Sequence, residues 1–207
     1  MRVESPSATS AAIRLDIPPD FHQVPLDRRV ESRTAAQLEV IRALGLSSPA
    51  QREAISLYLE ALSIRLAASN VVGTAFCAVR LAGRPSSATL TVAVPETHTG
   101  DAGLAALGAA EAMRREGSHD QVEIGSIAGR PIVSAVVQRA VRAGDVPTGQ
   151  PGSTVQEISV LVPIAGQTTA VMLTLSTPSL GDTETYRALV LDIARSVRTD
   201  HERAGSD

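Results

Sequence analysis

The feature that most limits what this chain can fold into is a strand-turn-strand pattern that occurs three times. Pairs of apolar runs flank Ala82-Gly83, Ala128-Gly129 and Ala165-Gly166. An apolar strand end followed by Gly and a polar residue is typical of a hairpin turn. The turns are unequally spaced along the chain, which argues against a tandem repeat. We therefore predict three β-hairpins.

Helical periodicity occupies four other parts of the chain. The first helix is expected between Val30 and Leu44, with Leu38 and Ile41 on its apolar face. Ser48 is well suited to cap a second, longer helix, and Pro49 after it fits the first helical position. The apolar stripe of this second helix consists of Ile55, Leu59, Leu62 and Leu66.

The remaining two helices lie in the second half of the chain. Asp101 is expected to cap the third helix, with Leu104, Leu107 and Met113 on one side of it. The fourth helix is expected to begin near Asp182. Its apolar stripe consists of Tyr186, Val190, Ile193 and Val197.

A short strand precedes all of these elements. Ile13, Leu15 and Ile17 alternate with charged residues, which is the period of a half-buried strand. Pro18-Pro19 ends it, because proline cannot donate a hydrogen bond to a ladder. We therefore expect an α+β fold, with a single mostly antiparallel sheet of about seven strands, one strand plus three hairpins, packed against about four helices.

One domain is expected over residues 11–199, with flexible tails at residues 1–10 and 200–207. Hydrophobic residues make up 43% of the chain and aromatic residues only 2%, so the core must be built from Val, Leu, Ile and Ala. All 19 basic residues are Arg. The absence of Lys, with richness in Ala and Gly, indicates a bacterial protein from a high-GC genome. It also excludes Schiff-base, pyridoxal-phosphate and P-loop lysines.

Cys77 is the only cysteine, so no disulfide can form within the chain. It sits in an apolar strand pattern, where a small buried hydrophobic side chain is expected rather than a nucleophile. The N-terminal sequence has no apolar core of a signal peptide, and no apolar run is long enough for membrane insertion. We therefore expect a cytoplasmic protein.

Candidate site residues are few. Phe21 follows the proline corner, where we expect it to close the end of the core, and His22 should point the other way, toward solvent or a partner. His98 lies in the loop before the third helix, whose N-terminus could hold an anion, although a polar connecting loop is the simpler interpretation. Phe21, His22 and His98 are the possible partner contacts.

Other chemistries lack support. None of the four histidines has a second His or Cys at ligand spacing, so no metal site and no other cofactor are expected. No G-x-S-x-G or G-x-G-x-x-G motif is present. The net charge is −3 and aromatic residues are scarce, so we expect no nucleic-acid binding. No catalytic residue is assigned.

The chain resembles the PsbP-like α/β sandwich, a fold found in a photosystem extrinsic subunit, a Ran-binding nuclear import factor and a family of mycobacterial surface lipoproteins. The opening "IRLDIPPDF" is similar to the family's first strand followed by proline and an aromatic residue. The closing "AVMLTLSTPS" followed by "TETYRALVLDIARSVR" is similar to its last strand and helix. The paired helices after Val30 are longer than that fold leads us to expect, and the lipoprotein signal is missing. The resemblance implies a non-enzymatic binding module.

The leading hypothesis is therefore a non-enzymatic protein-binding module, such as an adaptor, a chaperone-like partner or an assembly component. Its partner would be another protein, bound at a sheet edge or between the sheet and the paired helices. One alternative is a small-ligand-binding protein with an apolar pocket between sheet and helices. A less favoured alternative is an enzyme with a dispersed site that uses His98.

Overall fold

A computed structural model describes residues 2–3, 13–26, 30–45, 48–67, 71–115, 121–141 and 154–199. The expected tails at 1–10 and 200–207 lie outside these residues, except for Arg2–Val3. The helices are α1 Val30–Ala43, α2 Pro49–Ala67, α3 Ala102–Arg115 and α4 Thr183–Arg195, with a 3-10 turn at Leu180–Asp182 before α4. The strands are β1 Arg2–Val3, β2 Ile13–Arg14, β3 His22–Gln23, β4 Val71–Leu81, β5 Arg84–Ala93, β6 Gln121–Ile127, β7 Arg130–Ala140, β8 Thr154–Pro163, β9 Ala170–Thr177 and β10 Arg198–Thr199.

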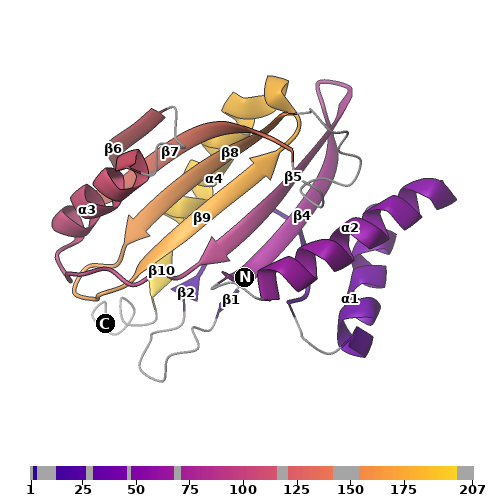
Figure 1. The fold of residues 1–207 in the computed structure, drawn as a ribbon, viewed down its shortest axis with the longest axis horizontal. Helices are drawn as coiled ribbons and strands as arrows, with labels where there is room; N and C mark the ends of the chain where they lie inside the picture. Colours follow the sequence, from indigo (N-terminus) through magenta and orange to yellow (C-terminus); the bar gives the residue numbers. More distant parts are fainter. Residues whose placement is uncertain are drawn as a thin grey trace.

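The expected α+β class is confirmed. The main sheet has seven strands in the order β3-β4-β5-β9-β8-β7-β6, and every neighbouring pair is antiparallel. Three of these pairs are the predicted hairpins β4–β5, β6–β7 and β8–β9. Figure 1 shows this sheet face-on, with α2 and α3 in front of it and α4 behind it.

The expectation that Ile13–Ile17 forms the first strand of this sheet is wrong. Ile13–Arg14 instead pairs with β1 and β10 in a separate three-stranded sheet. The prolines turn the chain, with the Phe21 N–H donating to the Pro18 carbonyl at 3.0 Å, and pairing with β4 resumes at His22. The seventh strand is therefore β3. Ile13 is still buried, as its alternation predicts, because it packs in the core under α4.

The turns of the first two hairpins are left-handed at both central residues. Ala82 and Ala128 have φ of 49° and 51°, and the glycines that follow them have φ of 79° and 77°. Positive φ at both positions is what a two-residue turn of type I′ requires. The third hairpin has a longer connection, from Pro163 to Ala170, in which Gly166 alone is left-handed.

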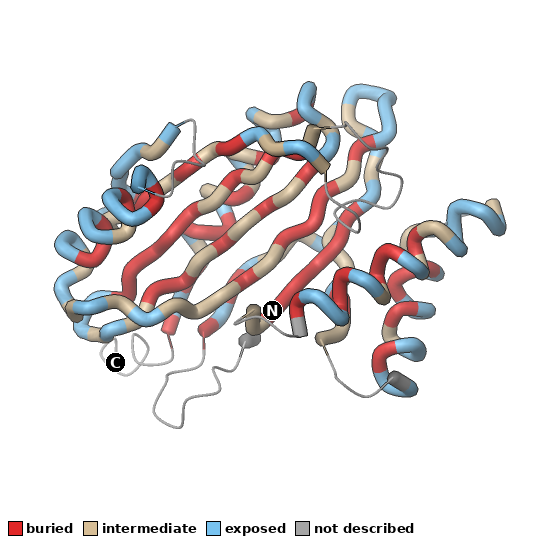
Figure 2. Tube along the Cα trace, viewed as in Figure 1, coloured by how far each residue is buried: buried red, intermediate tan, exposed pale blue. Residues whose placement is uncertain are grey.

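The two faces of the sheet are covered differently. One face packs against α4 along its whole apolar stripe, Tyr186, Val190, Ile193 and Val197, as predicted. On the opposite face, α1 and α2 cover one end through Phe76, and α3 covers the other end through Val133 and Leu161. Figure 2 shows the buried core running along the central strands between these helices.

The helix stripes were predicted with mixed success. The stripe of α2, residues Ile55, Leu59, Leu62 and Leu66, is buried as expected. The expectation that Leu104, Leu107 and Met113 share one side of α3 is wrong, because Met113 is buried whereas Leu104 and Leu107 are 59% and 56% exposed. Ala106 and Ala110 are buried with Met113 instead. Small alanines let the helix approach a sheet surface that already carries large side chains. Leu38 of α1 is likewise exposed rather than buried.

Candidate functional site

The extended segment Phe21–Leu26 forms one wall of an open groove at the edge of the sheet. The Val24 N–H donates to the Thr74 carbonyl of β4 at 2.9 Å, and the Val24 side chain is buried. On the other side, the Ser63 hydroxyl of α2 donates to the Pro25 carbonyl at 3.0 Å. The segment is therefore held between β4 and α2.

The other wall is α1, which is held in place by a polar contact with α2. Arg33 donates from Nε to Oε2 of Glu60 at 2.9 Å and from a terminal nitrogen to Oε1 at 2.5 Å. The Gln37 amide donates to the same Oε2 at 2.9 Å. These hydrogen bonds, first from Arg33 and then from Gln37, lower the pKa of Glu60. Since the Arg33 side chain is only 8% exposed, the carboxylate of Glu60 compensates a charge that is otherwise buried.

The groove between these walls has a volume of about 580 Å³. The wall formed by α1 consists of residues on one side of that helix. Two of them, Ala36 and Ala43, have small side chains and lie two helical turns apart. Small side chains at these positions leave the space that a larger residue would fill. The lining residues are Phe21, His22, Gln23, Pro25, Ala36, Glu39, Val40 and Ala43.

The groove also contains an edge of the main sheet. Because Val24 donates its N–H to β4, the alternation of an antiparallel ladder directs the N–H and C=O of the preceding Gln23 away from β4. Outward-directed backbone groups on an edge strand can pair with a further strand. Pro25 has no N–H and limits how far such pairing can extend in that direction.

The three predicted contact residues fall in two places. Phe21 and His22 both line this groove, although they were expected to point in opposite directions. His98 is exposed in the segment between β5 and α3, which runs beside the β8–β9 connection through a Thr97 N–H to Thr168 carbonyl bond of 2.8 Å. One N–H at the start of α3 already receives the Asp101 carboxylate, since Oδ1 accepts from Leu104 at 2.9 Å.

A polar surface that the sequence interpretation missed lies on the sheet between α2 and α3. Thr91, Thr174 and Ser159 are direct cross-strand partners on β5, β9 and β8, and all are half-buried. Ser159 and Thr174 share a hydrogen bond of 3.2 Å between their hydroxyls. Thr91 donates to the Thr174 carbonyl at 3.3 Å. The signal in the sequence is a pair of polar residues two positions apart in each strand: Thr89 and Thr91, Glu157 and Ser159, and Thr174 and Ser176.

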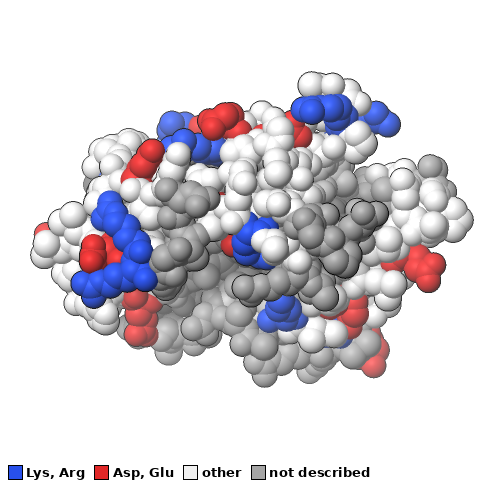
Figure 3. Space-filling model, turned by 45° about the horizontal axis from the view of Figure 1, so that its top comes forward, with Lys and Arg blue, Asp and Glu red and all other residues white. Residues whose placement is uncertain are grey.

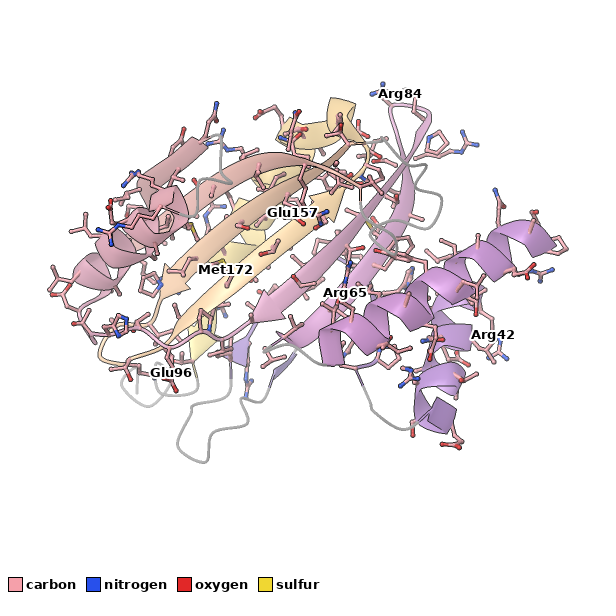
Figure 4. The ribbon with its side chains drawn as sticks, in the orientation of Figure 1. Arg42, Arg65, Arg84, Glu96, Glu157 and Met172 are labelled. Carbon is pink, nitrogen blue, oxygen red and sulfur yellow. The ribbon has the colours of Figure 1, made fainter. Side chains whose placement is uncertain are left out.

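An ion pair continues this surface toward β7. Arg139 donates to Oε1 of Glu157 at 2.5 Å, and the Ser176 hydroxyl donates to the same oxygen at 3.2 Å. Figure 4 shows Glu157 and Met172 on the sheet between the helices. The surface is therefore polar, unlike the apolar pocket that a small-ligand-binding protein was expected to have between sheet and helices.

Cys77 lies on the opposite face of the sheet and is buried, as predicted. Burial raises the pKa of its thiol to about 11. Burial also raises the pKa of Tyr186, whose hydroxyl bonds to the Ser86 hydroxyl at 2.8 Å. A thiol that stays protonated and covered has no nucleophilic role.

The described residues contain no group of three or more His, Cys, Asp and Glu side chains that could hold a metal ion. His119 and His201 lie outside the described residues. None of the described helices combines the length and the apolar character needed to cross a bilayer. Figure 3 shows arginine side chains interspersed with acidic ones on the face that it draws, in small mixed groups among the described residues.

No protein-family model matches the chain, and no curated protein matches it. The solved structures that are similar to it include the following two. LpqN, described as involved in cell envelope biogenesis of Mycobacterium tuberculosis, has a TM-score of 0.47 and 12% identity, with 95% of this chain and 88% of LpqN covered. The Ran-binding protein Mog1p of Saccharomyces cerevisiae has a TM-score of 0.44 and 12% identity, with 90% and 89% covered. Both fit the weak resemblance to the PsbP-like fold, and at this identity the similarity concerns the fold alone.

Proposed function

We propose that this chain is a non-enzymatic protein-binding module that holds an extended segment of another protein in the groove between β3 and α1. The observation that carries the proposal is the combination of a sheet edge with a helix across an open groove of about 580 Å³. An extended peptide that adds a strand to an edge gains main-chain hydrogen bonds, and pockets beside the edge select its side chains.

The groove has the features that such binding requires. The backbone of Gln23 supplies one donor and one acceptor directed away from β4. Phe21 supplies apolar surface on one wall, and the small side chains of Ala36 and Ala43 leave room on the opposite wall. Val24, Ser63 and the Arg33–Glu60 pair hold the walls before any partner arrives, which lowers the entropy lost on binding.

The experiment is a selection of peptides from a random display library against the full chain, followed by calorimetric titration of the selected peptides. Replacing Ala36 by Leu fills the groove and should weaken those peptides at least about tenfold. Ala35 is exposed next to it on α1 and does not line the groove, so Ala35→Leu is the matched control. Failure to select any peptide, or equal binding by Ala36→Leu and wild type, would overturn the proposal.

The proposal includes the expected cytoplasmic location and a single α+β unit over residues 11–199. The buried, free Cys77 is compatible with a reducing compartment. Limited proteolysis that leaves one fragment close to residues 11–199 would support the single unit. Fractionation of the native host would test the location.

A further inference from the structure

The second edge of the main sheet, β6, is longer than β3, and its described residues include neither a proline nor a bulge. It pairs with β7 over all of Gln121–Ile127 without a bulge, and its other side meets no described strand. Natural proteins commonly protect an exposed edge with proline, lysine or a bulge. β6 has no proline, and its one charged residue, Glu123, forms an ion pair of 2.7 Å with Arg187 of α4.

The hairpin register determines which backbone groups of β6 point outward. In a two-residue hairpin the residues that flank the turn, Ile127 and Arg130, exchange hydrogen bonds with each other. Alternation then directs the N–H and C=O of Ser126, Ile124 and Val122 away from β7. Ser126 is opposite Pro131, which has no N–H, as this assignment requires.

An apolar flank of α3 overlooks this edge. Arg114 donates to the outward carbonyl of Val122 at 3.4 Å, so the Arg114 side of α3 faces the edge. Leu107 lies seven residues earlier and therefore on the same side of the helix. Leu107 is 56% exposed, and Ile124 on the strand is 44% exposed. The edge thus combines outward backbone groups with apolar side chains from two elements.

We propose that this edge is the interface of a symmetric homodimer, in which β6 pairs antiparallel with β6 of a second copy about a twofold axis at Ile124. Ile124 then faces Ile124 of the second copy, and Val122 of each copy faces Ser126 of the other. Each of these pairs exchanges two backbone hydrogen bonds. The Val122 carbonyl can accept a second bond beside that from Arg114, because a carbonyl oxygen has two lone pairs.

The charges of β6 fit a second copy in this register. Glu123 of each copy lies opposite Gly125 of the other, so the two like charges do not face each other. Gly125 leaves space beside the Glu123 side chain. The axis also brings the two α3 helices to the same face of the joined sheet, where the flanks that carry Leu107 can cover one another. The small net charge of −3 opposes association only weakly.

The test is the mass of the full chain in solution by sedimentation equilibrium. We expect twice 21.6 kDa for the wild type. Replacing Ile124 by Pro removes an outward N–H without breaking the β7 ladder and should weaken the dimer at least about tenfold. Leu107→Glu should also weaken it. Leu57→Glu changes an exposed leucine of α2 and should leave the mass unchanged.

A charge pair tests the register, provided that circular dichroism shows each variant to be folded. A Cβ at Gly125 would lie 3.7 Å from Ile132, which is ordinary contact, so a side chain there is tolerated by the monomer. Gly125→Glu should weaken the dimer, and Gly125→Lys should preserve it by facing Glu123 of the second copy. A monomeric wild type would overturn the proposal. So would a dimer that Ile124→Pro, Leu107→Glu and Gly125→Glu all leave intact.

Discussion

Arg33 of α1 and Glu60 of α2 form a two-point contact in which the cation is buried and the carboxylate is 36% exposed. This asymmetry decides which partner is costly to remove. Losing the carboxylate leaves a buried guanidinium with one charge partner fewer, and the wall of the groove formed by α1 loses a contact to α2.

Glu60→Gln should lower the free energy of unfolding by about 1–2 kcal/mol, less than for a fully buried pair because solvent screens the exposed side. Urea unfolding measures the difference. The matched control is Glu39→Gln, because Glu39 also pairs with an arginine, Arg42, but with both side chains exposed. The control should change the free energy by less than about 0.5 kcal/mol. Equal losses in the two variants would contradict this assignment.

The same contact predicts a pH dependence. The pKa of Glu60 is lowered in the folded protein, from an ordinary value of 4.5. The contribution of the Glu60 carboxylate to the free energy of unfolding is therefore fully present above about pH 4.5, and it is lost as pH falls through the pKa of Glu60 in the folded protein. The difference in unfolding free energy between wild type and Glu60→Gln should be constant near neutral pH and shrink in acid. A difference that grows in acid would have the wrong sign.

The left-handed alanines at the first two hairpin turns offer a gain in stability. Alanine at positive φ costs roughly 1 kcal/mol, and asparagine tolerates this region better. Ala82→Asn and Ala128→Asn should each raise Tm by about 2–4 °C, measured by calorimetry. Ala165→Asn is the control, since Ala165 has no positive φ. A similar gain at Ala165 would show that turn geometry is not the cause.

Arg130 caps the end of α4 from the β6–β7 turn. Its terminal nitrogens donate to the Val197 carbonyl at 2.6 Å and to the Arg195 carbonyl at 2.8 Å. Arg130→Met should cost about 1–2 kcal/mol in urea unfolding, because carbonyls at a helix C-terminus lose a cationic donor. Arg80→Met removes a single bond to the exposed Gly83 carbonyl and should cost much less.

Cys77 should react slowly with a thiol reagent in the folded protein. With a pKa of about 11, only about a thousandth of the thiol is ionised at pH 8, and the sulfur is also covered. A colorimetric disulfide reagent should label it rapidly only after unfolding in urea. Rapid labelling of the native protein would show that the sheet opens on that face.

Much of the fold could be predicted because local patterns determine it. The hairpins are indicated by the turns at Ala82-Gly83 and Ala128-Gly129. Each of the helices α2 and α4 has a single apolar stripe, so only one face of each can be buried. In contrast, α3 carries two faces that could be buried, one of leucines and one of alanines. Only the sheet surface beneath it, with Val133 and Leu161, selects the alanines, and that surface is assembled from distant strands.

The candidate site was predictable only in part. The proline corner indicated that Phe21 and His22 lie where the chain leaves one sheet, but the groove also needs α1, whose position depends on its contact with α2. The hydroxyl row of Thr91, Thr174 and Ser159 depends on strand order, because β9 lies between β5 and β8. In the sequence β9 comes last of the three strands, so the alignment of these three hydroxyl groups cannot be predicted until the strand order and register are known.

The position of β9 has a consequence for synthesis. A nascent chain that has been made only as far as β8 contains two separate half-sheets, β3-β4-β5 and β8-β7-β6, with no strand to join them. Both halves expose an inner edge until Ala170–Thr177 leaves the ribosome, and α4, which covers the face behind them, is made later still. The sheet is therefore completed only after β9 has been made, and before that point the two half-sheets form an intermediate whose exposed edges a chaperone can bind.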